Sequence, residues 1–362
     1  MLHNIALTLV KGVGDYNLRT LVSHCGNAQN VFNAKVETLK KIPGIGPKTA
    51  EAIQSKEVFK RAEKEIIFIE KYKIQPLFYT DTDFPKRLHN CEDAPSILYF
   101  KGNTNLNNQK TVAIVGTRNA TAYGRAFCEK LISGLKKYNV LVVSGLAYGI
   151  DIAAHKAALN FKVDTIGVLG HGLDRIYPAV HRNIAEKMLE CGGLITEFPS
   201  ETNPDRQNFP KRNRIIAGMA DATIVVEAAI TGGALITAQI ANSYNRDVFA
   251  LPGRVEDEFS NGCNYLIKTN RAQLITKVED IEYILGWVQA QLQPKPQQLT
   301  IYPNLNNDEQ KIVKLIAEKN SINFDDLQLH LNIPQSKLAM AILNLEMQSI
   351  IIALPGKVYK LN

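Results

Sequence analysis

The stretch that decides the fold is residues 111–149, which read TVAIVGTRNATAYGRAFCEKLISGLKKYNVLVVSGLAYG. It begins with an apolar run (Thr111–Val115) and ends near a second apolar run (Val140–Ser144). Between the two runs, apolar residues recur at the spacing of a helix. Strands that are apolar on both sides fit a parallel sheet covered by helices on both faces. The alternation continues to residue 252, with further strand candidates at Thr165–Leu169, Gly193–Thr196, Ala222–Glu227 and Asp247–Ala250. We therefore predict an α/β core with a Rossmann-like parallel sheet.

The region before this core has a helical pattern from Ile5 to Ala62, interrupted by two glycine-rich turns. The second turn, Ile42-Pro-Gly-Ile-Gly-Pro-Lys-Thr-Ala50, resembles a helix-hairpin-helix. Such a turn leaves backbone N–H groups at a helix N-terminus, where they can hold a DNA phosphate. A tight glycine turn also serves simply to connect two packed helices, and the sequence leaves both interpretations open.

The region after the core is predicted to be a winged helix. Its expected elements are helices at Asp308–Glu318, Phe324–Leu331 and Ser336–Met347, followed by strands near Ile350–Ala353 and Lys357–Leu361. The third helix offers Lys337 as its one basic side chain, which favours a protein-interaction role over DNA reading. The predicted domains are therefore 1–85 (helical), 86–288 (α/β), 289–307 (a Gln/Pro/Asn-rich linker) and 308–362 (winged helix).

Composition narrows the class of protein. The chain has 362 residues and a formal net charge of +7, which favours a polyanionic partner. Residues 301–362 carry six basic and six acidic side chains, so we expect the polyanion site elsewhere. The N-terminus has no basic n-region and no apolar run is long enough to cross a membrane, which predicts a cytoplasmic protein without a membrane partner. The five cysteines stand far apart, so we expect neither a metal site nor disulfides.

The loops after the strand candidates are where an α/β sheet binds ligands. The loop 116–124 lacks two of the three glycines of a dinucleotide fingerprint, and Arg118 stands where the second would be. A guanidinium suits a nucleic-acid phosphate or base edge, and no nucleotide cofactor is expected. His155, His171 and His181 also follow strands, but singly placed histidines are more typical of polar packing than of metal or general-base sites.

The densest feature is residues 208–218, NFPKRNRIIAG, with three cations in four positions and no acid. Cations neutralise phosphates, Phe209 offers a ring for an unpaired base, and Asn208 or Asn213 can bond base edges, which suits single-stranded nucleic acid. The alternative is a solvated basic turn that caps the following helix, with Phe209 in the core. We favour binding, because a helix N-terminus normally prefers acids to Lys211, Arg212 and Arg214.

These motifs, taken in order, resemble the DprA/Smf family. The resemblance rests on the runs 115–118 (VGTR), 144–151 (SGLAYGID), 208–218, 235–238 (LITA) and 251–253 (LPG). It implies a homodimer, formed through the α/β domain, that binds and protects single-stranded DNA and loads the recombinase RecA during natural transformation and recombination. It implies no catalysis.

Carried over motif by motif, the resemblance implies a set of DNA-binding residues. They are Gly116, Thr117, Arg118, Asn208, Phe209, Lys211, Arg212, Asn213, Arg214, Gly232 and Gly233. Family members usually have Ser-Gly-Ser where this chain has Thr231-Gly232-Gly233, a change that keeps the loop small. They usually have Gly-Ala where this chain has Asn270-Arg271-Ala272, so the resemblance carries no site residue over to that edge of the pocket.

Two other functions compete. Related folds include nucleotide phosphoribohydrolases, but the loop 229–237 lacks their preceding proline and the glutamate that should follow. The acids nearest the strand ends, Asp151, Asp174, Glu197 and Glu227, are not paired in sequence with a nucleophile or base, so we predict no enzyme activity. A duplex-DNA regulator acting through the winged helix is disfavoured by the balanced charge of residues 301–362.

Overall fold

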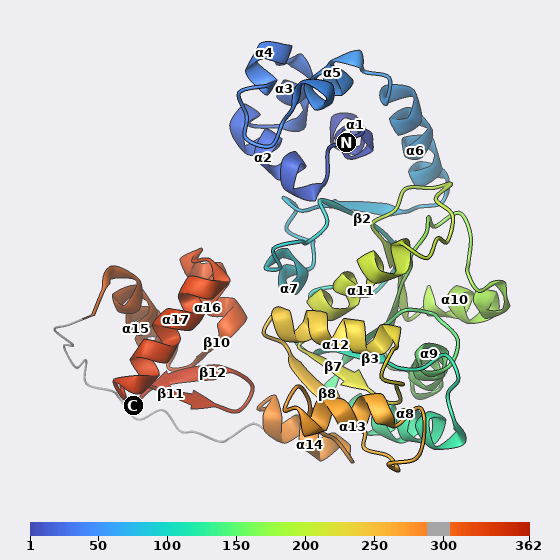
Figure 1. Ribbon diagram of the computed structural model, residues 1–362, viewed down its shortest axis with the longest axis vertical. Helices are drawn as coiled ribbons and strands as arrows, with labels where there is room; N and C mark the ends of the chain where they lie inside the picture. Colours follow the sequence, from blue (N-terminus) through green and yellow to red (C-terminus); the bar gives the residue numbers. More distant parts are fainter. Residues whose placement is uncertain (288–304) are drawn as a thin grey trace. The chain divides into compact units, whose positions relative to one another are not determined.

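The computed structural model describes residues 1–287 and 305–362 (Figure 1). They form two compact units, Met1–Leu274 and Ile275–Asn362, each of which is described here by itself. The predicted linker 289–307 lies outside the described residues except for its last three positions. The second unit begins at Ile275, and the predicted domain boundary at residue 288 stays a prediction.

A mixed sheet, which has nine strands in the described part of the chain, forms the centre of the first unit. The strands are β1 (Gln75–Phe78), β2 (Ile97–Gly102), β3 (Thr111–Val115), β4 (Leu141–Ser144), β5 (Thr165–Val168), β6 (Gly192–Thr196), β7 (Ala222–Val225), β8 (Asp247–Ala250) and β9 (Gln273–Leu274). Their order is β1-β2-β6-β5-β4-β3-β7-β8-β9. Neighbours from β6 to β9 pair in parallel, which confirms the predicted fold class.

The strand order reverses direction at β3. Helices α8 (Ala122–Leu135), α9 (Ile150–Phe161) and α10 (Arg182–Met188) connect β3 to β6 in one direction and pack as one group. The chain then returns through α11 (Asn208–Met219) to β7 beside β3, and α12 (Gly233–Ser243) packs with α11 and leads to β8 (Figure 1). The loops after β3 and β7 therefore diverge to opposite faces, which creates a crevice at the carboxyl ends of these strands.

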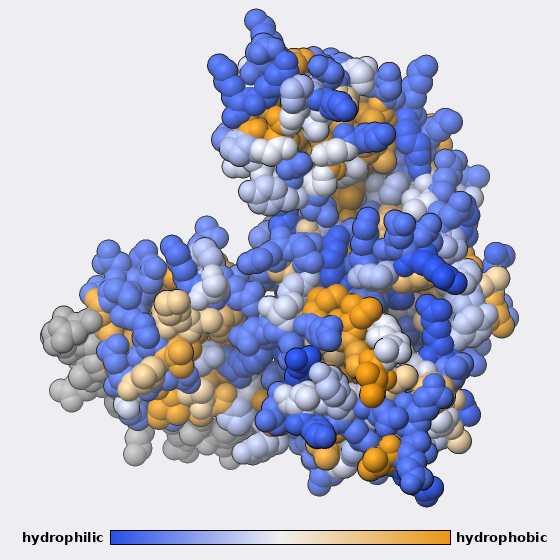
Figure 2. Space-filling view, viewed as in Figure 1, coloured by the Kyte–Doolittle hydropathy of each residue, from blue (hydrophilic) through white to orange (hydrophobic). Residues whose placement is uncertain are grey.

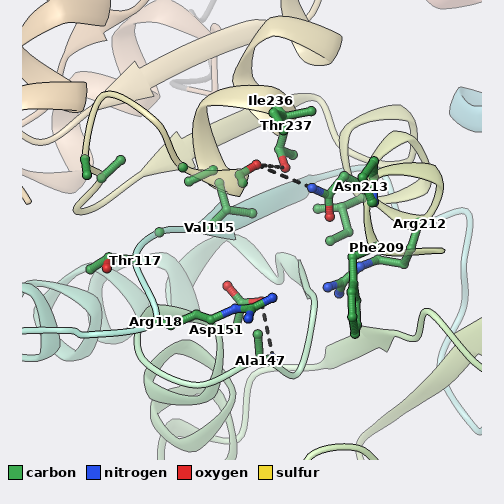
Figure 3. Close-up of a pocket in the computed structure, with 18 of the residues that line it drawn as sticks. Val115, Thr117, Arg118, Ala147, Asp151, Phe209, Arg212, Asn213, Ile236 and Thr237 are labelled. Carbon is green, nitrogen blue, oxygen red and sulfur yellow. Dashed lines mark hydrogen bonds between the residues drawn. The ribbon is translucent and has the colours of Figure 1, made fainter. Parts of the chain in front are cut away.

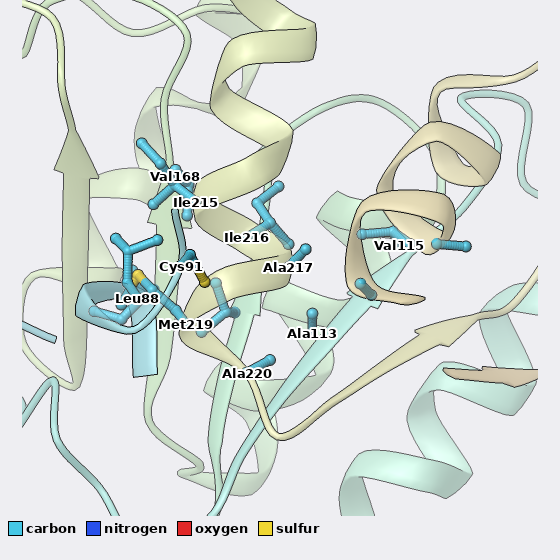
Figure 4. Packing of buried hydrophobic residues seen from close by; sticks show 14 of the residues in the cluster. Leu88, Cys91, Ala113, Val115, Val168, Ile215, Ile216, Ala217, Met219 and Ala220 are labelled. Carbon is cyan, nitrogen blue, oxygen red and sulfur yellow. The ribbon is translucent and has the colours of Figure 1, made fainter. Parts of the chain in front are cut away.

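The buried side of α11 forms much of the core near this crevice. Ile215 and Ile216 belong to the cluster that includes Ala113 and Val168 of the central strands (Figure 4). Leu88, on the short helix α7 (Lys86–His89), packs against the same helix, where Gly218 leaves it room. Close packing fixes the position of α11 on the sheet and hence the position of its first turn at the crevice.

Strand β2 is shared by two hydrophobic cores. Alternate side chains of a strand point to opposite faces. Ile97 and Tyr99 belong to the core of the helical region, whereas Leu98 and Phe100 belong to the core under the sheet. Because β1 (Gln75–Phe78) pairs with β2, the sheet begins before the predicted domain boundary at residue 85, which stays a prediction.

The helical region contains α1 (Leu2–Leu9), α2 (Asp15–Cys25), α3 (Ala28–Asn33), α4 (Val36–Leu39), α5 (Pro47–Ser55) and α6 (Phe59–Lys71). Each of its two glycine-rich turns packs against the first turn of the helix that follows the other one. A Cβ on Gly12 would lie 2.9 Å from Oγ1 of Thr49, the third residue of α5, and one on Gly44 would lie 2.8 Å from Oδ1 of Asn17, the third residue of α2. Both glycines have positive φ values, +88° and +83°, which favour glycine. The two turns are thus related as a structural repeat.

The second unit contains α14 (Val278–Ile284), α15 (Asn307–Lys319), β10 (Ile322–Asn323), α16 (Phe324–Leu331), α17 (Gln335–Met347), β11 (Ile351–Leu354) and β12 (Val358–Leu361). Asn306 begins α15 with a capping box to Glu309. The order from α15 onward is the predicted one with a short strand added, and its assignment as a winged helix stays a prediction. In the parts of the chain that the structure describes, no helix has the length and apolarity that crossing a membrane requires.

Candidate functional site

A cavity of about 810 Å³ lies at the crevice between the loops that follow β3 and β7. Its walls come from the loop after β3, the first turn of α11 and the start of α12 (Figure 3). Eight of the eleven predicted site residues line it: Gly116, Thr117, Arg118, Phe209, Arg212, Asn213, Gly232 and Gly233. Asn208, Lys211 and Arg214 are absent from the cavity wall that the described residues form.

The loop after β3 is held in place by main-chain contacts. The Thr117 N–H donates to the Glu227 carbonyl at 2.6 Å, and the Thr117 carbonyl accepts from the Ile150 N–H at 3.1 Å. The buried Glu227 carboxylate accepts from the N–H and hydroxyl of Thr121. These bonds fix the loop and leave the side chain of Arg118 exposed at the cavity.

Phe209 lies in the first turn of α11, so residues 208–214 belong to the helix itself and do not form the basic turn of the alternative interpretation. Pro210 is tolerated there because first-turn N–H groups need no partner within the helix. The Phe209 ring is partly exposed at the cavity, with the Arg118 guanidinium 5.7 Å from its centroid and the Tyr177 ring 6.2 Å away. The structure therefore places a guanidinium and two aromatic rings together at one wall.

Arg212 is not the free cation that the sequence predicts. It is buried, with 6% exposure, and its Nη1 donates to the Val168 carbonyl at 2.8 Å. Burial lowers the pKa of Arg212, which Asp151 opposes, and burial raises the pKa of Asp151, which Arg212 opposes. A Cβ on Gly145 would lie 1.9 Å from Arg212 Nη1 and 2.6 Å from Asp151 Oδ2, so glycine is required for the pair to sit there. Arg212 supports the cavity floor.

Arg214 holds the helical region against the sheet. Its Nη2 donates to Glu197 and lies 3.4 Å from Asp15 Oδ2, and its side chain is 11% exposed. Burial raises the pKa of Glu197 to about 7, and Arg214 opposes that shift. Arg214 thus has acidic partners that are distant in sequence, which explains why a basic residue without a local acid need not be free, and its assignment to the DNA site stays a prediction.

The two remaining residues outside the cavity also differ from their prediction. Asn208 donates to the Asn203 carbonyl at 3.2 Å instead of facing the cavity. Lys211 is exposed and interacts with Glu197, whose pKa it lowers. Neither residue is among those that line the cavity, and their assignment to the DNA site stays a prediction.

The opposite wall is the N-terminus of α12. Gly232 is its N-cap without a side-chain hydrogen bond, and Gly233 begins the helix. A Cβ on Gly233 would meet no heavy atom within 4 Å, so the approach to these N–H groups is open. Asn213 donates to the Gly233 carbonyl at 3.4 Å, which connects α11 to α12. Exposed N–H groups at a helix start favour an anion.

Sequence reasoning missed two residues that line the cavity. Arg206 is an exposed cation just before α11, and its nearness to the basic run was the signal that could have identified it. Tyr177 follows β5, and its position beside a proline in a long loop after a strand was a weaker signal. Together with Arg118 they give the cavity two accessible guanidinium groups and a second ring.

The three histidines pack in the core. His155 Nδ1 lies 2.7 Å from Thr165 Oγ1, His171 Nδ1 lies 2.9 Å from the Gly172 carbonyl, and His181 Nδ1 lies 2.8 Å from the Leu146 carbonyl. Burial lowers the pKa of His155 to about 3 and also lowers that of His171. Within residues 1–287 and 305–362, no group of three or more His, Cys, Asp or Glu side chains could hold a metal ion.

Comparison with known proteins places this geometry in a family. Residues 75–285 match the model of DNA recombination-mediator protein A, and residues 27–55 match the helix-hairpin-helix motif. Protein Smf of Synechocystis sp. is 37% identical over 289 residues, 78% of this chain and 72% of that protein. DNA processing protein DprA of Streptococcus pneumoniae is 41% identical over 201 residues, 56% of this chain and 71% of that protein.

Two solved structures are also similar. The X-ray structure of the Streptococcus pneumoniae protein aligns with a TM-score of 0.58 and 33% identity, covering 74% of this chain and 97% of that one. A structure concerned with the single-stranded DNA binding mode of DNA processing protein A from Helicobacter pylori aligns with a TM-score of 0.53 and 30% identity, covering 58% of this chain and 94% of that one. The chain therefore belongs to the DNA recombination-mediator protein A family, known by the names DprA and Smf.

Proposed function

We propose that this protein binds single-stranded DNA in the cavity between the loops after β3 and β7. The observation that carries the proposal is the placing of Arg118 over the ring of Phe209, opposite the open N-terminus of α12. Arg118 and Arg206 neutralise phosphates, the helix N-terminus accepts another, and the rings of Phe209 and Tyr177 receive unpaired bases. The Helicobacter pylori relative, described by its single-stranded DNA binding mode, supports the same ligand here.

The test is fluorescence anisotropy of labelled oligothymidine over a salt series. Arg118→Ala and Arg206→Ala should each lower affinity and flatten the plot of log affinity against log salt by about 0.7, the value for one phosphate contact on a single strand. Lys130→Ala, which removes an exposed cation on α8, is the matched control and should leave both quantities unchanged. Equal affinity for single-stranded and duplex DNA, or an unchanged slope in the double arginine variant, would overturn the proposal.

The proposed activity is binding without catalysis. Asp151 is the one acid among the described residues that line the cavity, and it faces Arg212. Glu227 accepts from Thr121, and Asp174 from Arg175 at 2.8 Å. Acids engaged in this way are poorly placed to activate water. Reproducible turnover of a nucleotide monophosphate that disappears in Asp151→Asn would contradict this assignment.

We propose that the bound strand is protected and passed to RecA during transformation and recombination, in the cytoplasm. Membership of a recombination-mediator family supports this role. RecA filament formation on single strands coated with a competing binding protein should be faster with this protein than without it. The Arg118→Ala, Arg206→Ala double variant should lose the acceleration, because the DNA must be held before it is transferred.

The proposal includes a homodimer formed through the α/β part. β9 is an edge strand of the sheet, and its residues Gln273 and Leu274 are both exposed. An edge strand offers unpaired main-chain groups to another copy of the chain. Sedimentation velocity of the full chain over a concentration series tests this, and a monomer at every concentration would contradict it.

A further inference from the structure

Two exposed tyrosines lie in the loops beside the cavity. Tyr148 follows β4 and is 49% exposed, and Tyr177 follows β5 and is 48% exposed. Within the described chain, neither hydroxyl makes a hydrogen bond to another protein group, although a tyrosine hydroxyl normally finds a partner when it is buried. Both rings are thus presented to solvent.

Tyr177 continues the aromatic wall that Phe209 begins. The two ring centroids are 6.2 Å apart with an interplanar angle of 35°, within the range of favourable aromatic pairs. This spacing leaves no room for a base to insert between the rings. A base can instead rest on the platform that the two rings form together.

Tyr148 is held rigidly although it is exposed. Its ring meets that of His181 at 5.0 Å in an edge-on arrangement, and His181 is buried and bonded to the Leu146 carbonyl. Leu146 and Gly149 on either side of Tyr148 have positive φ values of 58° and 79°. For a buried leucine that backbone conformation is strained, and such strain concentrates at functional sites.

The two tyrosines belong to one continuous edge. Tyr177 begins the turn that ends at His181, the residue that supports Tyr148, with the His181 N–H bonded to the Pro178 carbonyl at 3.0 Å. Gly149, next to Tyr148, approaches the main chain of Arg118, since a Cβ there would lie 2.5 Å from the Arg118 carbonyl carbon. The strand order places the loops after β7, β3, β4 and β5 in succession along this edge. A polymer leaving the cavity at β3 can therefore continue over the next two loops.

We propose that Tyr148 forms a second base-stacking subsite, which continues the aromatic wall of Phe209 and Tyr177 and carries single-stranded DNA out of the cavity across the loop after β4. The proposal rests on the proposed single-strand binding at the cavity. Stacking on an aromatic ring accepts any base, so the subsite lengthens the footprint on the strand without adding sequence specificity. It also predicts that bases beyond the cavity are bound through their faces and not through their edges.

The experiment is an abasic scan with the full-length protein. Affinities are measured for oligothymidines of increasing length and for a long oligonucleotide in which a single abasic site moves along the strand. Tyr148→Ala should weaken binding of the long strand by about 5- to 150-fold while the shortest strand that fills the cavity binds with less loss. Tyr148→Phe should bind like the natural protein, because it keeps the ring. Tyr283→Ala, at a tyrosine that is 71% exposed in the second unit, is the matched control.

The decisive result is that the effect of an abasic site on affinity depends on whether the Tyr148 ring is present. At one position, the abasic site should lower the affinity of the natural protein but not that of Tyr148→Ala, since the stacking partner is already lost. An abasic effect that is the same in both proteins at every position would overturn the subsite, as would equal losses for short and long strands. Failure of the natural protein to bind any oligothymidine would instead refute the proposed function itself, so the two failures are distinguishable.

Discussion

Replacing Arg212 with alanine should destabilise the first unit severely, although Arg212 stands in the basic run that the sequence assigns to DNA. The change removes the cation that opposes burial of the Asp151 carboxylate and the donor that satisfies the Val168 carbonyl. Breaking a buried ion pair costs about 3–5 kcal/mol, and an unsatisfied buried carbonyl costs about 1–3 kcal/mol. Since whole domains are stable by about 5–15 kcal/mol, the expected loss is a large share of the total.

The loss should depend on pH in a definite direction. Burial already raises the pKa of Asp151, and without Arg212 the folded-state pKa rises further above the unfolded value. Between the two pKa values the folded variant binds a proton that the unfolded chain releases, so its stability is greatest below the unfolded pKa and falls as pH rises from the unfolded pKa through the folded one. The slope is at most about 1.4 kcal/mol per pH unit.

The measurement is urea unfolding followed by circular dichroism at several pH values. A double variant, Arg212→Met with Asp151→Asn, removes both charges and should recover most of the lost stability and lose the pH slope. Trp287, the single tryptophan, lies in the second unit, and its fluorescence transition should not change. A loss below about 1 kcal/mol in Arg212→Ala, or a double variant no more stable than the single one, would refute the structural role of Arg212.

Four further outcomes are expected. Gly145→Ala should lower the thermal midpoint of the first unit by as much as Arg212→Ala does, because the new methyl group occupies the position of the guanidinium; an unchanged midpoint would contradict the close approach. Arg214→Ala should speed limited proteolysis between the helical region and the sheet without changing the salt slope of DNA binding, and a flatter slope would return Arg214 to the DNA site. Phe209→Ala should cost ~1–3 kcal/mol of binding and leave the salt slope unchanged, and removal of residues 301–362 should change single-strand affinity by less than about tenfold.

The sequence was sufficient for the elements whose patterns are local. Every strand candidate between Thr111 and Ala250 corresponds to a strand with nearly the same bounds, because continuous apolar runs are buried on both sides. β1, β2 and β9 were missed. β2 lies outside the alternation of strands and helices, and β9 has two residues, both exposed, so no burial pattern marks it.

The candidate site was predicted in part, and the errors have one physical cause. The cavity brings together the loops that follow β3 and β7, as the position of strand ends in an α/β sheet predicts. The side chains of the basic run, however, point in different directions, because the run is part of a helix. Arg212 faces inward to Asp151, and Arg214 faces Glu197 and Asp15. These acids are distant in sequence, so a local reading cannot distinguish a buried, compensated cation from a free one.

Strand β2 has a consequence for how this protein could change over generations. Because Ile97 and Tyr99 face the helical core while Leu98 and Phe100 face the sheet core, the helical region is not an appendage that a single deletion can remove. A lineage that lost residues 1–74 would present an isoleucine and a tyrosine to water on one face of the sheet, a surface prone to aggregation. Relatives without this region should therefore carry polar side chains at both positions, or cover them with another segment.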